Sequence, residues 1–458
     1  MTRTEHDFLG TIEFPLEVLW GIHTGRAIRN FPLSHRKVHP HLIQSYALVK
    51  KACCVTNREL GYLDDRRADA ICTACEEIAS GKFSDQFPLD SLQGGAGTST
   101  NMNLNEVIAN RANMILGLAP GTYSGDGVHP LDHVNLHQST NDTYPTALKV
   151  CMIAMIRSLA SAVEKLQGAL QRKEQAFAHI VTVGRTELQP AVPMTLGSEF
   201  GSFAECISRD RWRAFKCEER LRVVNLGGTA VGTGLTAPRR YIFRVTDVLR
   251  TLTGYGLARA ENLVDQTANA DSLVEVSGIL KAHAANLTKV ARDLRFLSQA
   301  GEIILFPVQA GSSVMPGKVN PVILEAVIQA GLKVRMNDTL VGEAVAHGSL
   351  QINEYMPLIA DTLTESLDLL QGANLMLANH VEKIEADRTE CEKRFSSSPV
   401  IVTALLPFIG YEKAACLLAE FTQQSNLTIR EFLAEKLGKD LVEQNLSPTA
   451  LSALGYQD

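Results

Sequence analysis

The sequence lacks the features that mark nucleic-acid-binding, membrane-spanning or secreted proteins. Its 44 basic residues are outnumbered by 50 acidic ones, giving a formal net charge of −6, and no basic run stands out. No apolar run approaches the ~20 residues of a membrane span, because the best stretch, Val150 to Ile156, ends at Arg157. The first residues have no apolar core of a signal peptide. We therefore expect a cytoplasmic protein with neither nucleic acid nor membrane as a partner.

Metal-binding patterns are also scarce. Among the nine cysteines, Cys72 and Cys75 form the single Cys-x-x-Cys pair, which lies in a helical pattern. A zinc ribbon needs a second pair, so we interpret the cysteines as reduced and structural. His129, His133 and His137 recur at every fourth position, but Pro130 interrupts them and no carboxylates stand at zinc-protease spacing. The sequence therefore predicts no metal site.

Three widespread catalytic motifs are absent. The segment from Gly311 to Gly317 has five residues between its glycines and is followed by Val319, whereas a phosphate loop has four and then Ser or Thr. Gly94-Gly-Ala-Gly97 lacks the dinucleotide-binding spacing and a surrounding βαβ unit. No Gly-x-Ser-x-Gly elbow of a hydrolase occurs. These absences argue against nucleotide chemistry and against serine-hydrolase chemistry.

Long apolar stripes at helical spacing are what the sequence does have. From Leu148 to Leu170 apolar residues recur at steps of three and four, which predicts about six helical turns. Similar stripes cover Asp271 to Gln299 and Leu363 to Leu377, and Thr195 to Val223 is predicted as a fourth helix. No strand pattern intervenes, which favours a bundle of long helices over a βαβ sheet.

We therefore predict an all-α chain in three parts. Residues 1–137 form a mainly helical N-terminal domain, residues 138–392 a central bundle of long helices, and residues 393–458 a small helical C-terminal domain. Long bundles often associate, because one helix cannot bury a wide apolar stripe alone.

Three segments are dense in Gly, Ser, Thr and Asn, and each borders a helical stretch: Gln93–Asn103, Gln138–Pro145 and Gln309–Pro321. Such residues also serve as helix caps and turns. Caps rarely need so many in a row, however, and Lys318 and Asn320 would have no role there. Together the segments offer neutral donors and one cation. That combination suits a small dicarboxylate, with N–H groups and hydroxyls on one carboxylate and Lys318 on the other.

The third segment resembles the signature loop of the fumarase/aspartase superfamily, Gly-Ser-Ser-x-x-Pro-x-Lys-x-Asn. Gly311-Ser-Ser-Val-Met-Pro-Gly-Lys-Val-Asn320 matches every fixed position, and we call it the signature loop. The resemblance extends over essentially the whole chain, from Trp20-Gly-Ile-His-Thr-Gly-Arg-Ala27 to Pro407-Phe-Ile-Gly-Tyr411. Gly184–Pro193 matches a further substrate-contacting segment. Ala96 and the amino-acid sequence of residues 21–27 resemble aspartases more closely than fumarases.

The resemblance implies reversible anti-elimination of ammonia from L-aspartate, giving fumarate, with Ser312 as the base that takes the Cβ proton. It implies no organic cofactor and leaves magnesium activation open. It also implies a homotetramer in which each active site gathers the three segments from three subunits. Thr98, Ser139, Thr140 and Ser313 would hold the carboxylate that becomes an enediolate, Lys318, Asn320 and Thr186 the other carboxylate, and Asn141 would face the leaving amine. Glu187 and Met315 complete the predicted substrate-binding set.

A serine is an unusual base, because its hydroxyl is a very weak acid. Ser312 could serve only if loop N–H groups and a nearby cation favoured its alkoxide, and Lys318 is the candidate cation. Gly311 and Gly317 would let the loop close over substrate and exclude water.

Two features depart from the family pattern. Glu187 stands where fumarases have a His that pairs with a Glu matching Glu325, and where aspartases have His or Gln. Glu187 either turns away into a structural ion pair or accepts hydrogen bonds from an unusual leaving group. In addition, the stretch Leu297–Pro307 is several residues shorter than the Ser-Gly-Pro-Arg segment that is common there. The rim of the site is therefore expected to be reshaped.

These departures keep other functions open. One is a sister lyase that releases another nitrogen group, such as nitrite from nitrosuccinate or a substituted amine. Fumarate hydratase comes third, and a silent structural tetramer last. His129 and Asp132 resemble a secondary dicarboxylate site of fumarases, for which a plain helix-start turn is the other interpretation.

Overall fold

The computed structural model describes residues 2–423 and 426–456. The chain separates into two compact units. The first unit comprises Met1–Leu159, Arg213–Lys281 and Lys333–Leu369, and the second comprises Ala160–Trp212, Ala282–Leu332 and Leu370–Asp458. The prediction of three domains was drawn at other boundaries and stays a prediction.

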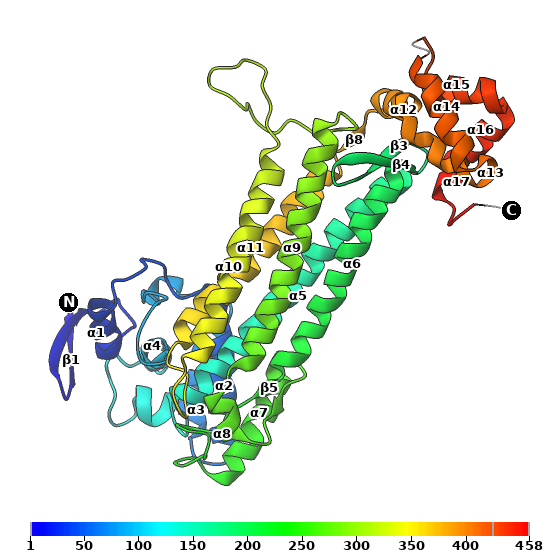
Figure 1. Cartoon of the computed structure of the whole chain (residues 1–458). Coiled ribbons are helices and arrows are strands. Elements are labelled where there is room, and N and C mark those ends of the chain that lie inside the picture. Colours follow the sequence, from blue (N-terminus) through cyan, green and yellow to red (C-terminus); the bar gives the residue numbers. More distant parts are fainter. Residues whose placement is uncertain (1, 424–425, 457–458) are drawn as a thin grey trace. The chain divides into compact units, whose positions relative to one another are not determined.

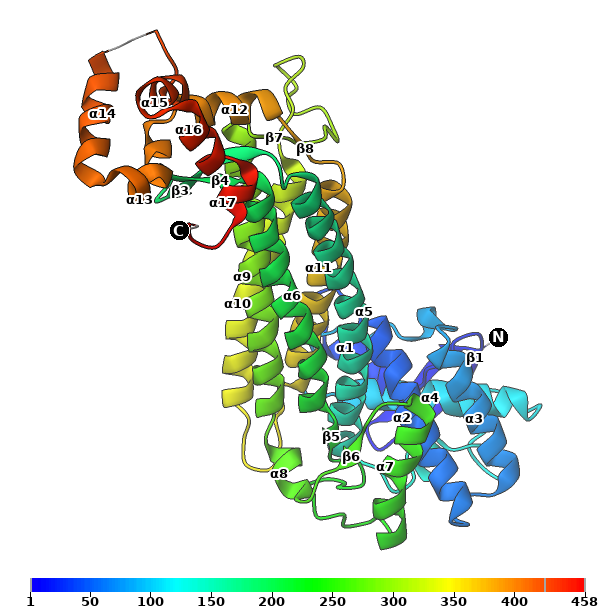
Figure 2. The same ribbon diagram turned by 90° about the vertical axis from the view of Figure 1, so that its right-hand side faces the viewer.

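The all-α prediction is confirmed, because the described residues form long helices and only two-stranded sheets. The five longest helices are α5 (Thr140–Ala176), α6 (Leu196–Leu221), α9 (Asp271–Gln299), α10 (Val322–Ala346) and α11 (Met356–Val381). Each unit contains a stretch of all five, and within a unit these stretches lie side by side, as Figure 1 and Figure 2 both show. All four helices predicted from apolar stripes are present, and α9 has the predicted ends.

Helix α5 qualifies the expectation about apolar runs. An 18-residue window of this helix reaches a mean hydropathy of 1.5, which is long and apolar enough for a membrane span. The stretch contains no unbroken apolar run of this length, because isolated polar residues interrupt it. Within the protein 72% of the window is buried, and its stripe residues Leu148, Met152 and Leu159 are buried in the bundle. That burial is the behaviour of a core helix.

The first unit surrounds its share of the long helices with shorter elements. They are β1 (Thr2–Asp7), β2 (Gly10–Pro15), α1 (Ile22–Asn30), α2 (Pro40–Glu59), α3 (Asp65–Ala79), η1 (Ser84–Gln86), α4 (Thr98–Ile115), η2 (Pro130–Val134), β5 (Val223–Val224), α7 (Arg239–Thr253), β6 (Ala258–Arg259) and α8 (Leu263–Ala268). Strands β1 and β2 form an antiparallel hairpin, and β5 pairs in parallel with β6. Cys72 and Cys75 lie on α3, as predicted, and none of the nine cysteines forms a disulfide.

Helix α4 is unusual because much of its buried surface is polar. Glu106 is buried on it and accepts hydrogen bonds from the backbone N–H groups of Gly21, His23 and Thr24 at the start of α1. Asn110 donates to the Leu19 carbonyl at 2.7 Å. These bonds satisfy helix-end donors that would otherwise be buried without partners. The polar side chains of α4 therefore hold the N-terminal segment in place.

The second unit carries the C-terminal helices and a hairpin. Its further elements are β3 (Val181–Thr186), β4 (Gln189–Thr195), β7 (Ile303–Ile304), β8 (Glu385–Ala386), α12 (Arg388–Ser397), η3 (Pro399–Leu405), α13 (Leu406–Ile409), α14 (Tyr411–Gln423), α15 (Ile429–Leu437), α16 (Lys439–Asn445) and α17 (Pro448–Ser452). Val181 and Val183 of β3 pack in one apolar cluster with Phe395, Ile401 and Phe432. The sequence patterns did not predict these short strands.

Candidate active site

Thr98 is the first residue of α4 and follows a glycine that the geometry requires. Gly97 has φ of +93°, and a Cβ on it would lie 2.3 Å from the ring of Tyr144, so only glycine fits. The Thr98 hydroxyl donates to the Gly95 carbonyl at 2.7 Å and is exposed. The glycine-rich segment is thus a tight turn that opens the helix N-terminus to solvent.

Ser139, Thr140 and Asn141 lie at the start of α5, which is a second helix N-terminus. The Asn141 N–H donates to Ser139 Oγ, and the Ser139 N–H donates to Asp142 Oδ1 at 3.0 Å. The other oxygen of Asp142 accepts from the N–H groups of Gly227 and Thr229. Burial raises the pKa of Asp142 to about 6. Asp142 therefore fixes the helix start from behind and leaves the hydroxyls of Ser139 and Thr140 on the other side.

These two helix starts border one open cavity of about 410 Å³. Thr98, Ser139, Thr140 and Asn141 all line it, and we call it the polar cavity. Backbone N–H groups and the positive end of the helix dipole favour an anion at a helix N-terminus. Asn141 donates its amide to the Ala230 carbonyl at 2.7 Å, and among the described residues no donor occupies its Oδ1 acceptor. The polar cavity is therefore suited to a carboxylate beside a cationic leaving group.

The signature loop lies in the second unit and is closed on itself. The Gly311 N–H donates to the Lys318 carbonyl at 2.7 Å, and the Asn320 amide donates to the Gly311 carbonyl at 2.8 Å. A Cβ on Gly311 would lie 2.8 Å from the Lys318 oxygen, and Gly317 has φ of +82°. Both glycines are therefore needed for this closed neck. From Ser313 to Val319 the loop is exposed, with Met315 and Lys318 directed to solvent.

Ser312 is half-buried, as are Gly311 and Asn320 at the neck of the loop. Its Oγ accepts hydrogen bonds from the backbone N–H groups of Val314 at 3.1 Å and Met315 at 2.8 Å. Two N–H groups aimed at one oxygen stabilise negative charge on it. This is the arrangement that an alkoxide base needs. The sequence indicates that loop N–H groups must stabilise the alkoxide, and the structure shows two such groups at Ser312 Oγ.

Thr186 and Glu187 lie at the tip of the hairpin formed by β3 and β4. The two residues between the strands, Glu187 and Leu188, have φ of +52° and +64°. Positive φ at both positions defines a type I′ turn, which usually takes Asn-Gly because larger side chains are strained there. Both side chains are exposed, and Glu187 forms no ion pair within residues 2–423 and 426–456. The turn thus presents a carboxylate that no described residue of this chain neutralises.

A buried ion pair anchors this hairpin. Arg185 Nη2 lies 2.9 Å from Glu302 Oε2, and the Thr182 hydroxyl donates to Glu302 Oε1. Glu302 is fully buried and belongs to the shortened stretch before the signature loop. The same stretch forms β7, which pairs with β8. The shortened stretch is therefore an ordered connection between the hairpin and the signature loop.

Comparisons with known proteins agree with this geometry. A family model described as Lyase matches residues 10–336. The chain is 43% identical over 456 residues to an aspartate ammonia-lyase of Helicobacter pylori, with 97% of both proteins covered. It is 40% identical to a class II fumarate hydratase of Thermosynechococcus vestitus, covering 95% of this chain and 94% of that protein.

This chain belongs to the fumarase/aspartase superfamily of lyases. Its structure also resembles a crystal structure of fumarate lyase:delta crystallin from Brucella melitensis bound to cobalt. The two share a TM-score of 0.94 and 40% identity, with 99% of this chain and 100% of that chain covered. The resemblance predicted from the signature loop is confirmed.

The remaining superfamily positions, Glu325 and His129, are not among the residues that line the polar cavity. Glu325 stands in the first turn of α10, 3.6 Å from Arg295. His129 caps η2, because its Nδ1 accepts from the N–H groups of Leu131 and Asp132. That cap fits the helix-start interpretation of the secondary site. In the described part of the chain no three His, Cys, Asp or Glu side chains form a group that could hold a metal ion.

Sequence reasoning missed several residues of the polar cavity. Asn101, Asn135 and Gln138 also line it. Asn101 donates to Thr140 Oγ1 at 3.0 Å and to Asn135 Oδ1 at 3.2 Å. Asn101 belongs to the first of the three polar segments in the sequence. Its hydrogen bond to Thr140, however, joins residues 39 positions apart. Periodicity carries no signal for such a contact.

Proposed function

We propose that this chain is an aspartate ammonia-lyase, which catalyses the reversible anti-elimination of ammonia from L-aspartate to give fumarate. The observation that carries the proposal is Ser312, whose Oγ accepts two backbone hydrogen bonds in the signature loop. The related aspartate ammonia-lyases, at 40–43% identity over nearly the whole chain, support the same carbon–nitrogen lyase activity.

The reaction begins at the Cβ–H bond of the substrate. Ser312, as the alkoxide, takes the proton, and the electron pair moves into the adjacent carboxylate to give an enediolate. When that pair returns to form the carbon–carbon double bond, the C–N bond breaks and its electrons leave with the nitrogen. The enediolate carries more negative charge than the ground state, so donors fixed around it accelerate the reaction.

Residues of the two units have complementary roles in this proposal. Thr98, Ser139 and Thr140 in the polar cavity, with Ser313 on the loop, hold the carboxylate that becomes the enediolate. The free Oδ1 of Asn141 accepts from the leaving ammonium group. The other carboxylate is held by the following residues: Lys318, the second amide hydrogen of Asn320, and Thr186. Met315 borders the substrate from the loop.

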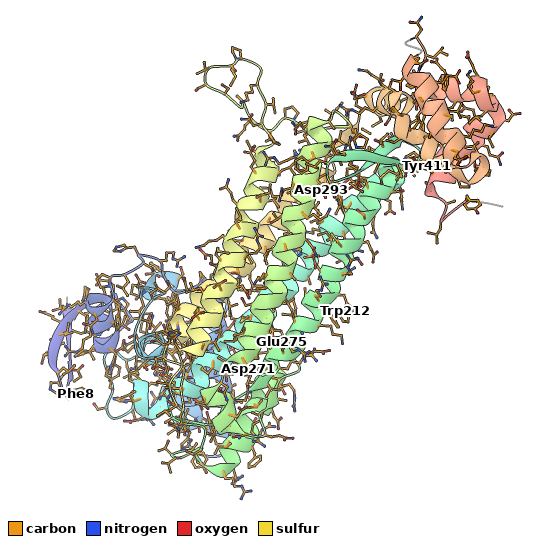
Figure 3. The ribbon with its side chains drawn as sticks, viewed as in Figure 1. Phe8, Trp212, Asp271, Glu275, Asp293 and Tyr411 are labelled. Carbon is orange, nitrogen blue, oxygen red and sulfur yellow. The ribbon has the colours of Figure 1, made fainter. Side chains whose placement is uncertain are left out.

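We further propose a homotetramer whose active sites each draw on three subunits. Supporting this, α10 exposes Leu332, Met336 and Leu340 at 48%, 64% and 41%. Residues at steps of four lie on one helix face, so the described residues leave this apolar stripe uncovered. Trp212 on α6 is also 63% exposed, and Figure 3 shows it on the outer side of the helix. Burying these side chains against other copies would remove them from water.

Glu187 keeps a second function in view. A carboxylate at the hairpin tip, which no described residue pairs with a cation, would repel a dianionic substrate and attract a larger cationic leaving group. This favours a sister lyase that releases a substituted amine. Nitrite release from nitrosuccinate stays an alternative, but Glu187 does not support it, because a carboxylate repels an anionic leaving group. Fumarate hydratase ranks third, because Glu187 replaces the His that fumarases pair with the position of Glu325.

The deciding experiment measures fumarate formation by its ultraviolet absorbance, with L-aspartate and L-malate as parallel substrates. We expect fumarate from L-aspartate and little or none from L-malate. Light scattering on the same sample tests the tetramer. Activity with malate alone would overturn the proposal in favour of the hydratase.

If an intact tetramer formed fumarate from neither substrate, the ammonia-lyase assignment would also be overturned. N-substituted aspartates and nitrosuccinate would then be assayed, together with a Glu187→Gln variant. A gain of aspartate activity in that variant would identify Glu187 as the residue that selects the leaving group. A silent structural tetramer would bind dicarboxylates weakly and convert none of them.

A further inference from the structure

Lys50 is a fully buried cation directly behind the polar cavity. It lies on α2 and is 0% exposed. Its Nζ donates to Asn135 Oδ1 at 3.0 Å and to Gln138 Oε1 at 2.8 Å. Both of these amides line the polar cavity. The charge is therefore separated from the cavity by a single layer of side chains.

No carboxylate in the described part of the chain forms an ion pair with Lys50. A buried charge without a counter-ion is costly, and burial lowers the pKa of Lys50 to about 8. An apolar side chain of the same length would fill the space without this penalty. The retained cation thus requires a compensating gain, and an anion in the polar cavity supplies one.

The titratable groups around Lys50 do not neutralise it. Burial raises the pKa of Cys53 on α2 to about 12 and that of Cys75 on α3 well above its usual range, so both thiols stay neutral. The phenols of Tyr46 on α2 and Tyr241 on α7 are likewise kept neutral by burial. Asp142 on α5 is the one carboxylate among these groups. It attracts Lys50 and opposes part of the effect of burial on the lysine's pKa, but it forms no ion pair with Lys50 within the described residues, and its oxygens accept from backbone N–H groups.

The contacts of Lys50 continue to the substrate-facing hydroxyls. Asn135 Oδ1 accepts from Lys50, Asn101 and Asn105. Asn101 in turn donates to Thr140 Oγ1. A cation on Asn135 and Gln138 thus holds the amide layer in one orientation, and its field reaches the cavity through a region with little water to screen it.

We propose that Lys50 is a positioning residue whose buried charge stabilises a carboxylate, and more strongly an enediolate, in the polar cavity through Asn135 and Gln138. The proposal rests on the proposed function, because it assigns Lys50 a part in the same anion site. Lys50 does not touch the substrate. It acts by electrostatic attraction and by orienting the two amides, so its loss lowers kcat and raises KM together.

The test compares Lys50→Met with Lys51→Met in the full-length protein. Lys51 is the next residue on α2, and its Nζ pairs with Glu76 at 2.7 Å on the surface. Succinate, a dicarboxylate that cannot react, is the probe, and calorimetry measures its Kd. We expect Lys50→Met to raise the Kd about tenfold or more and Lys51→Met to leave it unchanged.

A pH profile separates charge from packing. Between pH 6.5 and 9.5 succinate stays a dianion, whereas Lys50 loses its proton as pH rises through about 8. The wild-type Kd should therefore increase above that pH, and the Kd of Lys50→Met should stay flat. Burial also lowers the pKa of Lys149 to about 8, so Lys149→Met is measured in parallel and should keep the pH step.

The outcomes distinguish the two proposals. If the wild-type protein does not bind succinate, the proposed function fails. If it binds and Lys50→Met matches it at every pH, the role of Lys50 is overturned. Should Lys50→Met not fold, the wild-type profile decides, since an affinity independent of pH across this window contradicts the proposal. If Lys149→Met removed the increase of Kd with pH, that increase would belong to Lys149, and the proposed role of Lys50 would be overturned.

Discussion

The polar cavity and the signature loop reach anion stabilisation by opposite routes. In the polar cavity the groups are held from behind, by Asp142 on the start of α5 and by Lys50 on the amide layer. In the signature loop the donors are the loop's own N–H groups, and its ends are tied by bonds between Gly311, Lys318 and Asn320. One region is supported by neighbouring helices and the other by its own backbone.

The difference matches what each region does in the proposed reaction. A carboxylate must be bound in one place throughout turnover, so a preorganised cavity serves it well. A base must approach the substrate and then release the product, which favours a loop fixed at its neck and exposed elsewhere. Binding and proton transfer are therefore placed on structures of different stiffness.

The largest expected effect comes from Ser312→Ala, which removes the proposed base and leaves the loop's neck intact. We expect kcat to fall by about 10²–10⁴-fold, the range that a positioned general base contributes, with the oligomeric state unchanged. Fumarate formation and light scattering measure both. Ser202→Ala on the exposed side of α6 is the control and should be fully active. Near-normal turnover in Ser312→Ala would remove the loop from catalysis and break the comparison.

A smaller effect is expected from Gly311→Ala, which pushes the neck open. The added Cβ would meet the Lys318 oxygen at 2.8 Å and the Asn320 nitrogen at 2.9 Å. Displacing Ser312 by about 1 Å should lower kcat/KM roughly a hundredfold. Gly278→Ala on α9 is the matched control, because nothing lies within 4 Å of its added Cβ.

Alanine at position 278 should leave activity unchanged and raise the free energy of unfolding by up to about 1 kcal/mol, since alanine favours a helix more than glycine does. Thermal unfolding measures this gain. Equal activity in both glycine variants would show that the neck does not position the base.

The smallest effect is expected from Thr140→Val, which removes one hydroxyl from the polar cavity and keeps the side-chain shape. Loss of one hydrogen bond to a carboxylate should raise KM about tenfold, with little change in the cavity because Lys50 and Asp142 still support it. Thr251→Val on α7, an exposed position, should leave KM unaltered. Steady-state kinetics with L-aspartate measure both. A collapse of activity in Thr140→Val would mean that the cavity is no stiffer than the loop.

The long helices could be predicted because their information is local. Leu148 to Leu170 recur at helical spacing, and the ends of α9 follow from where its pattern starts and stops. The short strands could not be predicted, since β3 and β4 rest on pairing and on packing of Val181 and Val183 against the C-terminal helices. A two-stranded pairing leaves little periodicity in the sequence.

The candidate site divides in the same way. Gly311–Asn320 was recognisable because its residue types are fixed by chemistry and by its closed backbone, and Thr98 and Ser139 stood in polar segments at helix starts. The contacts of Asn101 and the location of Lys50 behind the polar cavity could not be predicted. Lys50 reaches Asn135 and Gln138 across 85 and 88 positions in the sequence.

By itself the sequence determined the helical architecture, the superfamily and the residues that carry the proposed chemistry, because each rests on local spacing or on a short motif. The tertiary structure alone decided which groups support them: two N–H groups on Ser312, a buried carboxylate behind Ser139, and a buried cation behind the polar cavity. Those contacts depend on burial and on the meeting of distant segments, and no local pattern records them.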